Sequence, residues 1–205
     1  MTTDVHSLMT LNKGWDDYQI SLVRAIAPLS REQLAWRPAP HLRSGGEIAS
    51  HIIGGRIQWF HSILGAGSTD FASQVAAWRP EDAIEENPAE LVRWLEATWQ
   101  MIEEALTNWD VADLAQTYQL PPYKGKNYAL TRQWIIWHVI AHDLDLVGGH
   151  PALRRRVAVG AGFQVKPARV PGAFHFQTLN KPLVQRCGAV RTHVVDGKTA
   201  VADAE

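Results

Sequence analysis

The segment Thr131–Leu146, with the sequence TRQWIIWHVIAHDLDL, constrains the fold of this chain more than any other. Its apolar residues recur at helical spacing and Thr131 suits an N-cap, so the segment predicts a helix with an extensive apolar surface. His138 and His142 lie four residues apart in it. Residues at this spacing share one face of a helix, so both imidazoles are expected to point the same way.

Two imidazoles on one helix face allow two interpretations. They can be core or half-buried histidines that form hydrogen bonds with their neighbours, and the spacing alone favours this interpretation. With nine histidines in 205 residues, chance readily produces such a pair. They can instead bind one transition metal from one side, but two ligands rarely suffice. The metal interpretation therefore requires a third ligand from elsewhere in the chain.

His51 is the candidate third ligand. The capping box Ser44–Glu47 predicts the start of a helix, and His51 lies within its apolar stripe, where a bulky aliphatic residue is expected. A neutral histidine there needs partners for both ring nitrogens, and a metal ion plus one hydrogen bond would supply them. Gly54–Gly55 lowers helix propensity, which indicates that another group packs closely against the backbone. His61 falls on a different helical face and is expected to be exposed.

Apolar periodicity predicts four long helices, at residues 3–27, 44–63, 87–109 and 131–147. Residues 65–87 form a long connection with a short irregular helix expected near Phe71 to Trp78. A connection of this length suits a crossover between parallel helices. Residues 110–130, with two adjacent prolines, a glycine and three tyrosines, are expected to form a second connection.

Charge and composition disfavour several classes of function. The chain is 46% hydrophobic and 20% charged, as expected for a soluble globular protein. Residues 1–150 contain 11 Lys and Arg against 18 Asp and Glu, and residues 151–205 contain 9 against 3. The net charge of the body is therefore −7 and that of the tail is +6, and the acidic body argues against nucleic-acid binding.

The sequence shows no recognisable targeting signal and contains one cysteine, and both observations favour a cytoplasmic protein. No apolar run is long enough to span a membrane, and the N-terminal residues lack the pattern of a signal peptide. Cys187 is the only cysteine, so no intrachain disulfide can form. We therefore expect a cytoplasmic location, with neither a membrane nor a nucleic acid as partner.

The character of the sequence changes after Pro151. Helical periodicity ends, and glycines, prolines and most of the basic excess appear. Residues 189–201, with Asp196–Gly197 at the centre, predict a β-hairpin. Two domains are therefore expected: a helical body at 1–150, and a C-terminal extension at 151–205 that is irregular or contains a short β-hairpin.

The segments GEIASHIIGGRIQWF at 46–60 and WIIWHVIAHDLDL at 134–146 resemble the DinB/YfiT-like superfamily, which includes thiol-dependent S-transferases and maleylpyruvate isomerase-like proteins. The resemblance covers roughly residues 5–150. It implies an all-α fold, a four-helix bundle in up-down-down-up order with a long crossover between the second and third helices. The ending Asp145–Leu146 resembles the isomerase-like branch and departs from relatives that continue with two further histidines.

The resemblance also implies a metal site. The matching positions are His51, His138 and His142, which would hold a divalent ion, zinc or nickel, while no further catalytic residue is assigned. The implied function is that of a metal-dependent S-transferase or isomerase that acts on a small organic substrate with a low-molecular-weight thiol of the mycothiol or bacillithiol kind. A homodimer is expected from the same resemblance. Asp143, next to His142, is expected to face solvent rather than to contact a histidine.

Two alternatives remain open at this stage. The bundle can bind a metal or a small molecule in a stress response without catalysing a reaction. It can also be a metal-dependent hydrolase, because hydrolysis and thiol transfer need the same open metal.

Overall fold

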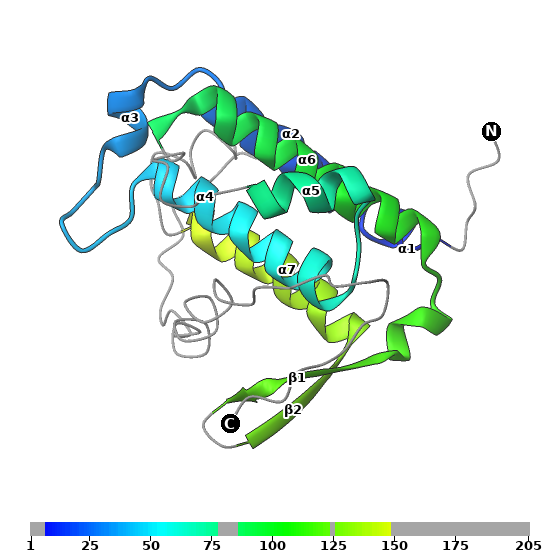
Figure 1. The fold of residues 1–205 in the computed structure, drawn as a ribbon. Helices are drawn as coiled ribbons and strands as arrows, with labels where there is room; N and C mark the ends of the chain where they lie inside the picture. Colours follow the sequence, from blue (N-terminus) through cyan, green and yellow to red (C-terminus); the bar gives the residue numbers. More distant parts are fainter. Residues whose placement is uncertain (1–6, 78–85, 124–125, 149–205) are drawn as a thin grey trace, which may run out of the picture. The chain divides into compact units, whose positions relative to one another are not determined.

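The computed structural model describes residues 7–77, 86–123 and 126–148, all within a unit that spans Met1–Pro167. These residues are mainly helical and contain one two-stranded antiparallel sheet (Figure 1). The predicted domain boundary at residue 150, the extension 151–205 and its hairpin at 189–201 lie outside the described residues.

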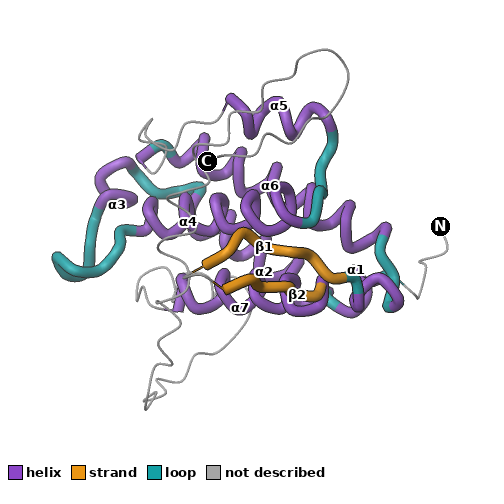
Figure 2. The backbone as a smooth tube through the Cα atoms, turned by 60° about the horizontal axis from the view of Figure 1, so that its bottom comes forward, coloured by secondary structure: helices purple, strands orange, loops and turns teal. Residues whose placement is uncertain are grey.

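Four long helical segments, here called rods, form the packed body of the protein. They are α2 (Lys13–Ile26), α4 (Gly45–Arg56) with its continuation η1 (Ile57–Ile63), α6 (Pro88–Asn108) and α7 (Arg132–Gly148). Shorter helical segments are α1 (Leu8–Leu11), α3 (Arg31–Ala35), α5 (Thr69–Ala77) and η3 (Ala112–Ala115). Helix α4 packs against both α6 and α7, and α2 packs against α6 (Figures 1 and 2). The up-down-down-up order of the four rods stays a prediction.

Side-chain caps begin three of the long helices, α4, α6 and α7, and those at Ser44 and Thr131 lie at the predicted positions. Ser44 Oγ accepts a hydrogen bond from Glu47 N at 3.2 Å, and Glu47 Oε2 accepts one from Ser44 N at 2.7 Å, which closes the capping box of α4. Asn87 caps α6 through its side chain. Thr131 Oγ1 accepts a hydrogen bond from Trp134 N at the start of α7. These local bonds satisfy amide groups that a helix N-terminus leaves without partners.

The predicted apolar stripes form the core. Its fully buried members come from all four rods and include Leu22, Ile26, Ile52, Leu91, Leu95, Ile102 and Ile135. The first predicted helix is divided into α1 and α2 at Asn12, and its first four residues, 3–6, lie outside the described part. The expected short helix near Phe71 is present as α5. None of the described helices is both long and apolar enough to cross a membrane.

The rod that begins as α4 changes to π-helical hydrogen bonding along η1. Leu64 N donates to Trp59 O, five residues back, at 3.1 Å. This wider turn changes which side chains face inward, so the exposure predicted for His61 from α-helical spacing is wrong. The His61 ring is half-buried, 5.4 Å from the ring of Phe71, and its Nδ1 lies 2.8 Å from Ala66 O.

The prediction that residues 110–130 are only a connection is also wrong. They contain η3 and most of a β-hairpin formed by β1 (Thr117–Tyr123) and β2 (Lys126–Thr131). Adjacent prolines disfavour the central strand of a sheet, but an exposed two-stranded hairpin has edges that tolerate proline. The sequence signal for these strands is the alternation of half-buried and exposed side chains. The half-buried ones that pack against the core are Tyr118, Leu120 and Leu130.

Arg132 fastens this hairpin to the helical body. Its guanidinium lies 4.1 Å from the Trp109 ring centroid and pairs with Asp113 at 3.2 Å. Its Nε donates to Tyr118 Oη at 3.1 Å, and its backbone N donates to Gln116 O at 2.8 Å. One buried arginine therefore joins η3, β1 and the end of α6 to the first turn of α7.

Candidate metal centre

The structure brings together two of the three predicted ligands. His51 on α4 and His142 on α7 direct their Nε2 atoms at each other across 3.2 Å, although 91 residues separate them in sequence. The ring centroids are 4.9 Å apart at an angle of 45°. Both rings are partly buried. Two neutral imidazoles in this position can share one proton in a hydrogen bond, or both lone pairs can face a cation.

His138, the third predicted ligand, lies one helical turn from His142, with ring centroids 6.1 Å apart. Its ring stacks on Trp134 at 4.7 Å and 11°, and meets Trp59 edge-on at 4.9 Å. Its Nε2 is buried and has no hydrogen-bond partner among the described residues. No group of three or more His, Cys, Asp or Glu side chains in the described ranges is spaced to hold a metal, so the three-histidine site stays a prediction.

The chemistry of these donors fits a divalent ion. A buried, unpartnered ring nitrogen is rare unless something outside the chain uses it, and His138 Nε2 is such an atom. The facing Nε2 atoms of His51 and His142 supply two more imidazole donors, and the ring centroid of His142 lies 6.1 Å from that of His138. Imidazole nitrogen is a ligand that zinc and nickel both accept.

Gly55 allows the His142 ring to approach α4. A Cβ at this position would lie 3.1 Å from His142 Cε1 and 3.4 Å from its Nδ1. The prediction from sequence, that something packs closely against the Gly54–Gly55 backbone, is confirmed at Gly55. The packed group is one of the predicted ligands.

Burial keeps two of the histidines uncharged. It is the main cause that lowers the pKa of His51 from 6.5 to about 4, with smaller contributions from Arg43 and His142. Burial, with a contribution from His142, lowers the pKa of His138 to about 4 as well. At neutral pH both rings are therefore neutral, which is the form that binds a metal.

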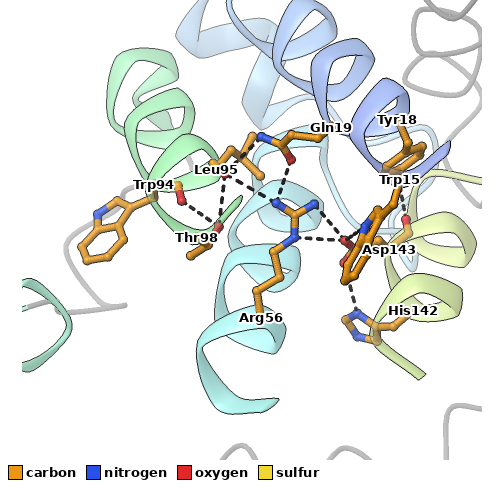
Figure 3. A network of polar contacts seen from close by, with 9 residues as sticks. All are labelled: Trp15, Tyr18, Gln19, Arg56, Trp94, Leu95, Thr98, His142 and Asp143. Carbon is orange, nitrogen blue, oxygen red and sulfur yellow. Dashed lines mark hydrogen bonds and ion pairs between the residues drawn. The ribbon is translucent and has the colours of Figure 1, made fainter. Parts of the chain in front are cut away.

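A buried ion pair lies next to His142. Arg56 on α4 and Asp143 on α7 are both 0% exposed, and Arg56 donates to Asp143 Oδ2 through Nη2 at 2.8 Å and Nε at 3.0 Å (Figure 3). Gln19 Oε1 accepts from Arg56 Nη1 at 2.7 Å, and Trp15 Nε1 donates to Asp143 Oδ2 at 3.3 Å. Tyr18 Oη donates to the Asp143 carbonyl at 2.7 Å. This cluster joins α2, α4 and α7.

Burial raises the pKa of Tyr18, and the Asp143 carboxylate adds to the effect. The phenol therefore keeps its proton and remains a hydrogen-bond donor throughout the physiological range.

The prediction that Asp143 faces solvent is wrong. Helical spacing predicts that the position next to His142 faces outward, but Arg56 lies there and neutralises the carboxylate. Arg56 was not singled out from the sequence. An arginine among isoleucines and glycines in the stripe of α4 was the available signal, because a buried arginine requires an acidic partner.

Replacing Gly55 with alanine is expected to displace the His142 ring and, if the three predicted histidines hold zinc, to weaken its binding roughly tenfold, as the loss of residues that support metal ligands does. Stability is expected to change by less than about 1 kcal/mol, because the gain in helix propensity offsets the crowding. Chelator competition and urea unfolding measure the two quantities. Gly14→Ala is the matched control, since its Cβ would meet nothing within 4 Å. Wild-type zinc affinity in Gly55→Ala would contradict this role for Gly55.

The stability of the metal-free protein is expected to depend on pH through His51 and His138. Their pKa values of about 4 lie below 6.5, so the unfolded chain takes up protons first as the pH falls. The free energy of unfolding should therefore decrease from pH 6.5 towards pH 5. The decrease should be only about 1 kcal/mol per histidine, because solvent screens rings that are partly exposed. Urea unfolding with a chelator present measures this slope. His138→Gln should flatten it, and an equal slope in that variant would contradict the assignment.

Comparisons with known proteins agree with this architecture. A model of the DinB superfamily matches residues 17–145. A crystal structure of a DinB-like protein from Bacillus cereus is similar with a TM-score of 0.53 and 17% identity, covering 80% of this chain and 98% of that one. The structural likeness concerns the fold alone at this identity. No curated protein matches the sequence. Because the family model covers more than half of the chain, the protein belongs to the DinB superfamily.

Proposed function

We propose that this protein is a divalent-metal-dependent enzyme, with His51, His138 and His142 as the metal ligands. The observation that carries the proposal is the 3.2 Å approach of the Nε2 atoms of His51 and His142 from two different helices. The buried Nε2 of His138, unpartnered among the described residues, supports the third ligand. The lowered pKa values of His51 and His138 support it as well, because both rings keep a free lone pair at neutral pH.

Three histidine ligands leave a coordination position open, which is typical of catalytic rather than structural sites. A divalent ion held there would lower the pKa of a bound thiol or water and so provide a nucleophile at neutral pH. Zinc and nickel are the metals we propose, because imidazole nitrogen suits both.

Aromatic side chains next to His138 provide a surface for an organic substrate. Trp134 stacks on the His138 ring and is 36% exposed, and Trp137 is 54% exposed. Trp59 contacts His138 from η1. Exposed indoles beside a polar centre suit a small apolar or aromatic molecule whose reactive group is held at the histidines.

The reaction we propose is the transfer of a low-molecular-weight thiol to a small electrophile, or an isomerisation that uses such a thiol as cofactor. With the Nε2 lone pairs of His51 and His142 directed to the ion, a thiol bound at the open coordination position would lose its proton at neutral pH and so become the nucleophile. The resemblance to thiol-dependent members of the superfamily supports this reaction class.

Elemental analysis tests the metal site. Wild-type protein is expected to contain about one divalent ion per chain, the occupancy of a single site. His51→Ala should reduce the content to near zero, since it removes one of the ligands that α4 and α7 contribute jointly. His61→Ala is the matched control, because this histidine lies on the same rod and its Nδ1 is already paired with Ala66 O. Near-zero metal in the wild type under metal-replete conditions would remove the proposal.

Thiol-consumption assays test the reaction. Mycothiol and bacillithiol, with a panel of electrophiles and added zinc, nickel or manganese, are expected to give metal-dependent turnover that His142→Ala reduces at least 100-fold, the scale expected when a metal ligand is lost. Tight metal binding without turnover under any of these conditions would instead favour a non-catalytic binding protein. Ester or amide cleavage without thiol consumption would identify a hydrolase.

A further inference from the structure

The carboxylate of Asp143 has one oxygen that its hydrogen bonds do not use. Its Oδ2 accepts from both Arg56 Nε and Nη2 and from Trp15 Nε1. Its Oδ1 is buried and has no hydrogen-bond partner among the described residues. A buried anionic oxygen without a donor is costly, so its retention needs an explanation beyond the ion pair with Arg56.

This free oxygen lies beside a candidate metal ligand. Asp143 Oδ1 is 4.0 Å from Nδ1 of His142 (Figure 3). The other ring nitrogen of His142, Nε2, faces His51. The carboxylate and the His51 ring therefore approach His142 from opposite sides. A neutral imidazole carries one proton, and a negative oxygen on the Nδ1 side favours the tautomer with the proton on Nδ1.

We propose that Asp143 is a positioning residue for His142. It holds the imidazole proton on Nδ1 and so leaves the lone pair of Nε2 directed towards His51 and the metal position. In the metal-free protein His51 then supplies the proton of the contact between the two Nε2 atoms. The consequence for metal affinity rests on the proposed function, whereas the tautomer of His142 can be observed without a metal.

Arg56 makes this arrangement possible. It occupies Oδ2 with a two-pronged contact, and the Oδ1 atom remains on the side of His142. Gln19 holds the guanidinium from α2, and the Leu95 carbonyl on α6 lies 3.5 Å from its Nη1. Because Gln19 and Leu95 contact Nη1 while Asp143 contacts Nε and Nη2, the guanidinium is held by α2 and α6 as well as by the carboxylate.

A purely structural ion pair would behave differently. The double substitution Arg56→Met with Asp143→Leu removes both charges together, and replacing a whole buried pair by apolar side chains is often neutral or stabilising. If the pair only joined α4 to α7, the folded double variant would retain the tautomer of His142 and its zinc affinity. If Asp143 positions His142, both properties change while the fold is kept.

Nitrogen-15 NMR of the histidine rings, with His142→Gln to assign the signals, tests the proposal in metal-free full-length protein. The wild type should show His142 with a protonated Nδ1 and a bare Nε2. The double variant should lose this preference and bind zinc 10–100-fold more weakly in chelator competition, the range expected when the partner of a metal ligand is lost. Thr98→Val, in the same buried polar cluster but without contact to Asp143, should change neither.

A wild-type His142 that carries its proton on Nε2 would overturn the proposal, whether or not the double variant folds. A folded double variant with wild-type zinc affinity would overturn it too. A wild-type protein that binds no zinc but has His142 protonated on Nδ1 would remove the proposed function and leave the positioning role supported.

Discussion

The buried ion pair between Arg56 and Asp143 is the interaction on which the arrangement of this structure depends. Removing two charges from water is expensive, and the cost is recovered only if both groups find close partners. Arg56 gives two hydrogen bonds to the carboxylate and one to Gln19, and Trp15 donates to the same carboxylate. These residues belong to α2, α4 and α7. Their mutual positions are therefore restricted by directional contacts, where apolar packing alone would allow sliding.

The same two helices carry the facing histidines. His142 directly precedes Asp143 on α7, and His51 lies five residues before Arg56 on α4. Any shift that would separate Nε2 of His51 from Nε2 of His142 would also strain the ion pair one helical turn away. Gly55 completes the arrangement, because it leaves room for the His142 ring beside the α4 backbone. The core and the candidate site are therefore parts of one contact between α4 and α7.

Prediction from sequence succeeded where neighbouring residues decide the outcome. The caps at Ser44 and Thr131 and the apolar stripes needed only local spacing. It failed for His61, because a π-helical turn changed the spacing, and for the hairpin, because adjacent prolines concealed an alternating pattern. It failed for Asp143 because the helical pattern cannot show that a distant arginine neutralises a buried carboxylate.

The sequence by itself determined the number of long helices, their approximate ends and the residue types capable of metal chemistry. These properties follow from hydrogen bonding and side-chain periodicity within a few residues of the chain. Only the tertiary structure decided that His51 meets His142, that His138 packs between two indoles, and that Asp143 faces inward. Each of these depends on how α4 and α7 are rotated and shifted against each other. That relation is set by the summed packing and charge pairing of residues almost ninety positions apart, which no local pattern encodes.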